Sequence, residues 1–318
     1  VGYSKTNFAD PEAGAGRQNW GNPWFTTLLA YPYESPDDWY NVDNPTLITK
    51  YYDRETGRLK TVASVYAKAS ITDWLSVKTN FGLDFMYNRN VSTLHRDHPN
   101  AQQNHGYYGQ TSSELFRYTW TNTINVNKDF ANGHSLNAVA GMEMFQGKWY
   151  TSNFTGYDLN SDMMQSPAGI GDKSGSSLFP PSIGGGRTMS NLMSFFAQAS
   201  YSIANKYNFS ASLRHDTSSK FYEDNASATF WSVGASWLIS SESWFDNAKW
   251  LNQLKLRASY GTTGNQDGVS DFGTFDGYYN SSYNGESGYS HGQLGNSELR
   301  WETSAQTNVG LDVSVLDS

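Results

Sequence analysis

The sequence contains no cysteine among its 318 residues, and only 16% of them are charged. The absence of cysteine excludes disulfide bonds, thiolate metal sites and cysteine nucleophiles. A soluble domain normally carries about 25% charged residues, so the charge content is low as well. The net charge of −8 argues against nucleic acid as a partner, because phosphate binding requires a basic surface.

Long apolar runs are also absent. No segment approaches the roughly 20 mostly apolar residues that a membrane-spanning helix requires, and the uncharged residues 188–205 are interrupted throughout by serine, asparagine and glutamine. The chain begins at Val1 without a signal-peptide pattern and ends at Ser318 directly after a strongly patterned segment. We therefore expect a fragment at both ends.

The sequence is rich in aromatic residues, 15% of the total, and from Thr61 onward apolar and polar residues alternate. A period of two is the pattern of a β-strand with two unlike faces. Residues 1–60 contain several prolines and are predicted to form an irregular, aromatic-rich extracellular segment with a short helix near 47–52. Nine later segments are predicted strands: residues 63–71, 75–87, 116–126, 136–144, 193–203, 207–213, 231–239, 254–260 and 301–315.

The predicted connections alternate between short and long. The short ones are residues 72–74, 128–134 and 204–206, with a somewhat longer one at 240–253, and the long ones are residues 88–114, 146–191, 217–229 and 262–300. This alternation is the signature of an antiparallel, up-and-down transmembrane β-barrel with short periplasmic turns and long extracellular loops. The fold class is therefore all-β, and residues 61–318 are predicted to be barrel strands and loops.

Strand length and charge placement favour a membrane barrel over a soluble β-protein. A tilted membrane strand needs about 9–11 residues, whereas soluble strands average about 5–6, and residues 75–87 and 301–315 exceed both lengths. The charged residues that we compared within these strands, such as Lys68, Asp84 and Arg214, alternate with the apolar rows and never interrupt them. A lipid-facing Arg or Lys costs roughly 2–4 kcal/mol near the bilayer centre, so a charge-free face is what a membrane strand needs.

Four stretches resemble signatures of the SusC/RagA family of TonB-linked (TonB-dependent) outer-membrane transporters. They are residues 256–266 (LRASYGTTGNQ), residues 299–303 (LRWET) with the later Gln306 to Asp312, residues 213–216 (LRHD) with Ser218, Ser219 and Phe221, and residues 232–237 (SVGASW). Two positions depart from the family pattern: Thr217 stands where glycine is usual, and Trp231 where proline usually precedes the serine. Both departures concern local loop shape. The chain resembles part of the barrel only.

The resemblance implies a 22-stranded barrel, of which this chain supplies about nine strands, and an amino-terminal plug that is absent from this chain. It implies TonB-dependent import of a bulky nutrient, either an oligosaccharide or glycan or a peptide, across the lipid bilayer of the outer membrane. The implied partners are a SusD-like surface lipoprotein that acts as a lid and the TonB complex, which contacts segments outside this chain. Pairing of two barrels with two lids is a family habit. The alternatives are a passive porin-like or adhesive barrel, and a soluble carbohydrate-binding β-protein.

Candidate binding residues fall into two groups. Four charged residues of the polar rows are expected to face the lumen, where they contact cargo or plug or neutralise one another: Lys255, Arg257, Glu302 and Asp312. Aromatic residues of the predicted loops offer flat faces that suit sugar rings, peptide side chains or a lid protein: Trp39, Tyr107, Tyr108, Trp149 and Tyr278.

Catalysis and cofactor binding have no candidate residues. No Gly-x-Ser-x-Gly, P-loop or His-Glu-x-x-His motif is present, so we expect neither enzymatic activity nor a cofactor. His95, His98 and His105 share one predicted loop with Asp97. A metal site needs about four converging ligands, and surface loops collect histidine by composition, so no metal site is predicted.

Overall fold

The structure, a computed structural model, describes residues 2–7, 51–98, 101, 104–161, 166–171, 179–245 and 250–315. Its strands are β1 (Gly2–Asn7), β2 (Tyr52–Ser70), β3 (Leu75–Leu94), β4 (Tyr107–Phe130), β5 (His134–Tyr157), β6 (Ser182–Ile203), β7 (Tyr207–Ser218), β8 (Ser227–Leu238), β9 (Leu251–Asn265), β10 (Gly277–Tyr283), β11 (Glu286–Gln293) and β12 (Glu302–Val315). Short 3-10 turns are η3 (Ala131–Gly133), η4 (Pro167–Gly169), η5 (Glu223–Asn225), η6 (Ile239–Ser241) and η7 (Ser243–Phe245). None of the helices in these ranges has the length and apolar character needed to cross a membrane.

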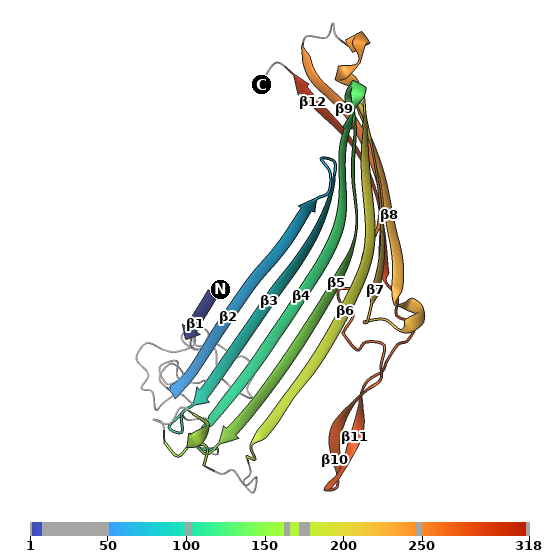
Figure 1. Cartoon of the computed structure of the whole chain (residues 1–318). Helices are drawn as coiled ribbons and strands as arrows, with labels where there is room; N and C mark the ends of the chain where they lie inside the picture. The colour runs from blue at the N-terminus through green and yellow to red at the C-terminus, as the bar shows by residue number, and fades with distance from the viewer. Residues whose placement is uncertain are drawn as a thin grey trace. The chain divides into compact units, whose positions relative to one another are not determined.

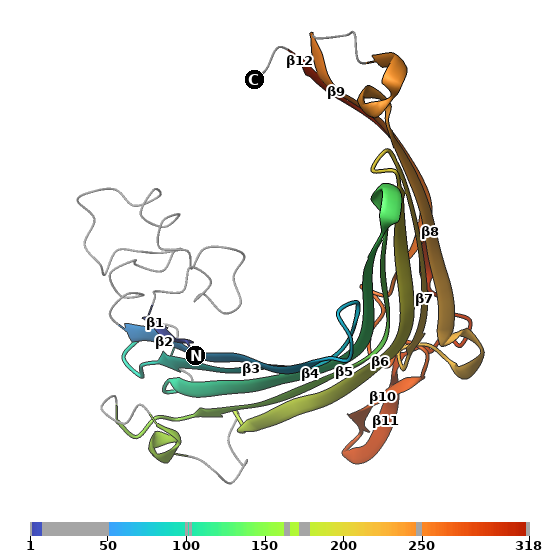
Figure 2. The same cartoon turned by 45° about the horizontal axis from the view of Figure 1, so that its top comes forward.

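Ten of the strands form one antiparallel sheet in the order β1-β2-β3-β4-β5-β6-β7-β8-β9-β12. Strands consecutive in sequence lie side by side from β2 to β9 (Figure 1), and the rotated view in Figure 2 shows the same neighbours. β12 pairs with β9, and the connection between them carries the separate hairpin β10–β11. The nine predicted strands correspond to β2 through β9 and β12, so the predicted all-β, up-and-down order is confirmed.

The alternation of short and long connections is also confirmed, but the strands are longer than predicted. β2 to β6 have 19 to 24 residues each. A strand of 24 residues extends roughly 80 Å at about 3.3 Å per residue, whereas crossing the apolar band of a membrane takes about 9–11 residues. These strands therefore continue well beyond the membrane at their long-loop ends.

The amino-terminal segment that was predicted to be irregular contains strand. β1 pairs with β2 from Gly2↔Lys60 to Asn7↔Glu55, and β2 already begins at Tyr52. The prediction was wrong for these residues because β1 is too short to show a periodic signal and takes its conformation from a distant partner. The residues between β1 and Tyr51, which include most of the predicted helix near 47–52, lie outside the described residues.

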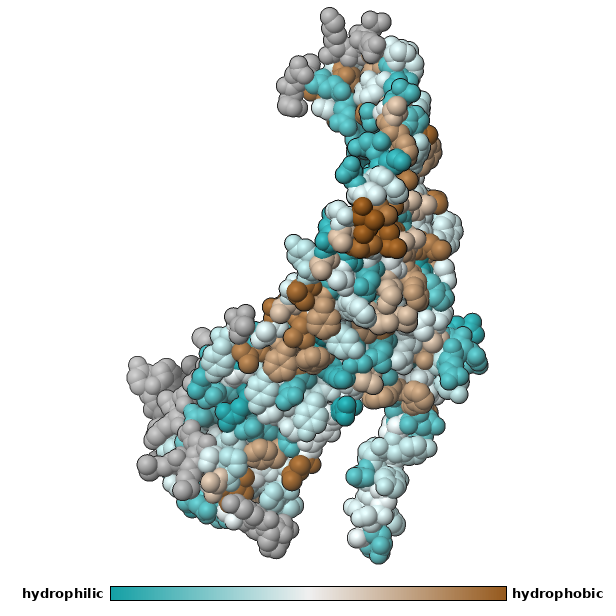
Figure 3. Space-filling model, in the orientation of Figure 1, coloured by the Kyte–Doolittle hydropathy of each residue, from teal (hydrophilic) through white to brown (hydrophobic). Residues whose placement is uncertain are grey.

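Strands β7, β8, β9 and β12 present two unlike faces. The register aligns Phe209, Ala235, Ala258 and Val309 on one side, here called the apolar face, and Ser210, Gly234, Ser259 and Asn308 on the other, here called the polar face. Side chains of the apolar face are exposed, 51% for Phe209 and 75% for Val309. Figure 3 shows apolar patches over the sheet, while the β10–β11 hairpin is hydrophilic or neutral. Such a face needs apolar surroundings.

The buried apolar side chains gather at the long-loop ends of the strands. By contacts the chain divides into two compact units: Val1–Val62 with Asp84–Phe116 and Lys148–Arg187, and Ala63–Leu83 with Arg117–Gly147 and Thr188–Ser318. The first unit contains one cluster of Tyr52, Leu94 and Ala101 and another of Tyr108, Leu159 and Ile170. The second unit contains buried Phe221 and Phe230. The long connections thus pack on themselves, and the strand middles leave their apolar face uncovered.

Candidate functional site

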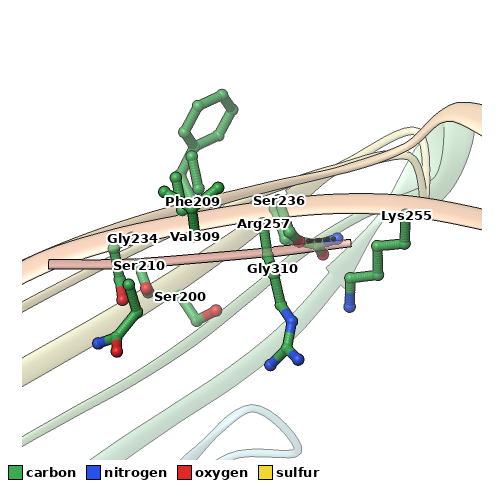
Figure 4. Close-up of a pocket in the computed structure, with 14 residues that line it drawn as sticks. Ser200, Phe209, Ser210, Gly234, Ser236, Lys255, Arg257, Val309 and Gly310 are labelled. Carbon is green, nitrogen blue, oxygen red and sulfur yellow. Dashed lines mark hydrogen bonds between the residues drawn. The ribbon is translucent and has the colours of Figure 1, made fainter. Parts of the chain in front are cut away.

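Three of the four predicted luminal residues lie together on the polar face of β9 and β12. The register places Asp312 opposite Lys255 and Gly310 opposite Arg257, and Arg257 Nη2 lies 3.2 Å from Asp312 Oδ1. Gly310 allows this contact, because a Cβ there would lie only 2.7 Å from Arg257 Nε. Figure 4 shows Lys255 and Arg257 projecting from one side of the strands and Phe209 from the other.

Lys255, Arg257 and Gly310 border an open hollow of ≈ 540 Å³ on the polar face. Two cations, Lys255 and Arg257, line it, and Asp312 beside them supplies one carboxylate, so one positive charge is left over. Arg257 has 61% of its side chain exposed, and an exposed ion pair contributes only about 0–1 kcal/mol. The remaining polar lining is hydroxyl and amide groups, from Ser200, Asn208, Ser210, Ser236, Ser259 and Asn308. The hollow therefore offers hydrogen-bonding groups and a weakly held cation to a water-soluble molecule.

Glu302, the fourth predicted luminal residue, does not join this cluster. It begins β12 and accepts a hydrogen bond from Asn265 Nδ2 at 3.0 Å. Asp312 follows on the same strand at a distance of roughly 30 Å, at about 3.3 Å per residue. Glu302 therefore belongs to the long-loop end of the strands and Asp312 to the short-turn end.

A second polar-face cluster, centred on Arg214, was not selected from the sequence. Arg214 Nε donates to both carboxylate oxygens of Asp216 at 2.7 and 3.0 Å, and Nη2 donates to Ser194 Oγ at 2.8 Å and Glu143 Oε1 at 3.3 Å. The guanidinium also lies 5.9 Å from the ring centroid of Phe196. Asp216 is 6% exposed and Ser194 is fully buried, so this pairing is less screened by water than an exposed one. Only the two-residue spacing of Arg214 and Asp216 was visible in the sequence.

Aromatic residues join the connections 219–226 and 266–301. The ring centroid of Trp301 lies 5.2 Å from that of Phe221 and 5.7 Å from that of Phe230, and its Nε1 donates to the carbonyl of Ala226 at 3.1 Å. Gly264 is required beside them, because a Cβ at this position would overlap the ring of Phe230. We call Phe221, Phe230 and Trp301 the aromatic cluster.

Polar contacts reinforce the same junction. Ser218 Oγ donates to Gln266 Oε1 at 2.5 Å, and Lys220 Nζ donates to the carbonyl of Val269 at 2.9 Å and lies 3.8 Å from Asp271 Oδ1. A second hollow of ≈ 450 Å³ is bordered by residues of this junction and by Arg214. Residues from three of the four stretches that carry the family resemblance thus meet at one end of the sheet.

The aromatic candidates have different environments from those predicted. Tyr107 and Tyr108 lie in β4 and Trp149 lies in β5. Their assignment to loops was wrong because these strands extend past the membrane, where alternation is no longer dictated by lipid. Tyr108 is 1% exposed and packs against Leu159, so it holds the loops together and presents no binding face.

The other aromatic candidates remain accessible or undescribed. The ring of Tyr107 is partly buried against Tyr52, at a centroid distance of 6.5 Å, and Trp149 is exposed. Tyr278 lies in the β10–β11 hairpin, exposed, with its ring centroid 4.9 Å from that of His291. Trp39 lies outside the described residues.

The three histidines of the predicted loop have different surroundings. His95 Nε2 lies 2.9 Å from Asp53 Oδ2, His105 Nδ1 lies 3.1 Å from Asp158 Oδ1, and His98 is buried. These two side-chain contacts tie one end of the connection to β2 and the other to Asp158, which directly follows β5. Within the described ranges, no group of three or more His, Cys, Asp or Glu residues is suited to a metal ion.

At the short-turn end, Glu242 links two connections. It accepts hydrogen bonds from Tyr207 Oη at 2.6 Å, Trp237 Nε1 at 3.1 Å and Lys206 Nζ at 3.2 Å. These bonds, the one from Tyr207 first, lower the pKa of Glu242 below its usual value, because they favour the ionised carboxylate. The turn at 204–206 and the connection after β8 are thereby held together.

Comparison with known proteins agrees with this architecture. The profile of the family "TonB dependent receptor-like, beta-barrel" matches residues 2–318. TonB-dependent receptor P39 of Formosa agariphila is 28% identical over 280 residues, which are 87% of this chain and 26% of that protein. TonB-dependent receptor SusC of Bacteroides thetaiotaomicron is 35% identical over 137 residues, 41% of this chain and 14% of SusC.

A solved structure of the RagAB peptide transporter superposes with a TM-score of 0.79 at 24% identity, over 90% of this chain and 31% of the other. At this identity the similarity shows the fold. The chain spans about a quarter to a third of the length of the curated relatives that it matches over most of its residues. The family match over nearly all residues shows that the chain belongs to the TonB-dependent receptor β-barrel family of the outer membrane, as the SusC/RagA resemblance of its sequence predicted.

Proposed function

We propose that the protein containing this chain imports a bulky nutrient, a glycan or a peptide, across the outer membrane with energy supplied through TonB. The observation that carries the proposal is the pair of unlike faces on one antiparallel sheet, in a chain whose family comprises TonB-dependent receptors. One face suits lipid, and the other is hydrophilic and carries the hollow beside Arg257. We assign no catalytic step to the chain.

Lys255 and Arg257 are the residues of this chain that we propose to contact cargo or plug, with Asp312 orienting the guanidinium. The ion pair with Asp312 involves the Nη2 group of Arg257, so the guanidinium keeps further N–H donors for other acceptors. Carbonyl, carboxylate and sugar hydroxyl oxygens all fit this donor set, so both cargo classes are compatible with it. Glu302 is assigned instead to the long-loop end, where cargo would enter.

At the long-loop end, we propose that a SusD-like surface lipoprotein covers the entrance and that two such barrel–lid pairs associate. The RagAB structure is described as a peptide transporter, and that description belongs to RagAB. In this chain Tyr278, one of several exposed tyrosines of the β10–β11 hairpin, is the candidate for contact with a lid or with cargo. Copurification of a lipoprotein with the full-length protein, reduced by Tyr278→Ala, is the expected result.

The test of import uses the full-length protein in its own bacterium. Deleting the gene should abolish uptake of one glycan or peptide pool, and the wild-type copy should restore it. Lys255→Ala with Arg257→Ala should reduce uptake about 30-fold at equal surface abundance, because two charge-assisted contacts of about 1 kcal/mol each are lost. Lys78→Ala, which removes one lysine of the polar row of β3 away from the hollow, serves as the control.

Two results would contradict the proposal. Uptake that persists without TonB would favour a passive porin-like barrel. Unchanged uptake of every tested nutrient in the deletion strain, together with lost attachment of cells to a surface, would favour an adhesive barrel. If import is established but the variant with both Lys255→Ala and Arg257→Ala takes up nutrient at the wild-type rate, only the proposed role of Lys255 and Arg257 is refuted.

A further inference from the structure

The last residues of β4 break the apolar row on which they lie. Trp120 and Ile124 lie on the same face of β4 and are both exposed, as expected for a lipid-facing row. The same parity then brings Lys128 and Phe130 to this face at the short-turn end. A lysine in a lipid-facing row costs roughly 2–4 kcal/mol at the bilayer centre but about 0–1 kcal/mol near the interface. Lys128 therefore marks the depth at which this face leaves the hydrocarbon.

The ammonium group of Lys128 is held between two aromatic rings. Its Nζ lies 5.2 Å from the ring centroid of Trp74 and 5.3 Å from that of Phe130, which are cation–π distances. The amide of Asn127 donates to the carbonyl of Trp74 at 2.8 Å, so the β2–β3 turn and the end of β4 are fixed to each other. Both rings remain exposed, 41% for Trp74 and 43% for Phe130.

No carboxylate of the described residues forms an ion pair with Lys128. Lys206, which lies in another short connection, is by contrast 3.2 Å from Glu242. Within the described part of the chain, the positive charge of Lys128 thus has no carboxylate partner, and it lies on a face whose exposed residues are otherwise largely apolar. A negatively charged group that is present at this depth of a membrane is the lipid phosphate.

We propose that Lys128, Trp74 and Phe130 form a binding site for the phosphate of a phospholipid in the periplasmic leaflet. The ammonium donates to the phosphodiester oxygens, the two rings lie at headgroup level, as interfacial aromatic residues do, and the acyl chains cover the apolar row above. This inference rests on the membrane placement of the chain and is independent of what the protein imports. A free phosphate ion would use the ammonium but leave both rings exposed to water.

The test measures lipid retention by the full-length protein purified in a mild detergent. Dioleoyl-phosphatidylglycerol is titrated and bound lipid is counted by native mass spectrometry. Lys128→Ala should weaken retention of the tightest-bound lipid about tenfold, and Lys128→Arg should restore most of it. Lys68→Ala is the matched control, because it removes the same charge from the polar parity of β2 and should leave retention unchanged.

Two ligand controls identify the recognised group. Dioleoylglycerol, with the same acyl chains but no phosphate, should be retained no better by the wild-type protein than by Lys128→Ala. Inorganic phosphate at millimolar concentration should not displace the lipid. Equal retention by Lys128→Ala and Lys68→Ala, equal retention of dioleoylglycerol, or displacement by inorganic phosphate would each overturn the proposal. Unchanged heat-modifiable electrophoretic mobility of the variants verifies that the barrel is folded.

Discussion

Removing the indole of Trp301 should open the junction between the connections 219–226 and 266–301. Replacing a core Trp by Ala costs about 3–5 kcal/mol, and this includes two ring contacts of about 0.5–1.5 kcal/mol each and a hydrogen bond of similar worth. Trp301 is half-buried, so we take the lower figure of about 3 kcal/mol. At about 1.4 kcal/mol per factor of ten, Trp301→Ala should raise the population of the open junction about 100-fold.

Hydrogen exchange of residues 219–226 in the full-length protein measures this opening, because the local opening free energy sets the exchange rate. Trp301→Phe, which keeps a ring but loses the hydrogen bond to Ala226, should accelerate exchange by only about fivefold. Trp231→Ala is the matched control. Its side chain is exposed on the apolar face and contacts Tyr260. If Trp301→Ala accelerates exchange no more than Trp231→Ala, the aromatic cluster does not hold the junction.

Two further predictions concern a glycine and a carboxylate. Gly264→Ala should destabilise the same junction by about 1–3 kcal/mol, because the added Cβ displaces the buried ring of Phe230. Adding Phe230→Leu to this variant should recover part of the lost stability. If hydrogen exchange is faster in Gly264→Ala and Phe230→Leu does not slow it again, overlap of the Cβ with the Phe230 ring is not the cause. The lowered pKa of Glu242 means that its contribution to stability is present above about pH 4.5 and is lost as the pH falls through the lowered pKa. The difference in exchange protection of residues 204–206 between wild type and Glu242→Gln should therefore be largest near pH 7 and shrink below about pH 4, whereas a pH-independent difference would show that the ionised carboxylate is not responsible.

The strands and their order could be predicted from the sequence because alternation is a local property. Each residue of a pleated strand faces opposite to its neighbours, so the row of Phe209 and the row of Ser210 are visible in a few consecutive letters. The membrane adds a second local constraint, since a lipid-facing charge is costly. Where β3, β4 and β5 extend beyond the lipid, their side chains still alternate, but neither face has to be apolar. The sequence pattern is therefore lost there, and the predicted strand ends were wrong.

The candidate site was only partly predictable for a related reason. Lys255, Arg257 and Asp312 could be selected together because hairpin-like pairing of β9 with β12 follows from strand order. Which of these residues face each other across β9 and β12 depends on the strand register. The contact of Arg257 with Asp312 also depends on the absence of a side chain at Gly310. Glu302 shares their parity but lies at the other end of the strand, which parity alone does not show.

The sequence by itself determined the two-faced strands, the alternation of short and long connections and membership of the TonB-dependent receptor barrel family, because each depends on residue type at fixed local spacing. Only the tertiary structure decided which side chains meet. Arg214 contacts Glu143 at a separation of 71 residues, Trp301 donates to the carbonyl of Ala226 75 residues away, and Lys128 lies beside the ring of Trp74 in the β2–β3 turn. Such contacts depend on the register of strands that are distant in sequence, and register is set by the summed pairing of whole strands, which no single motif records.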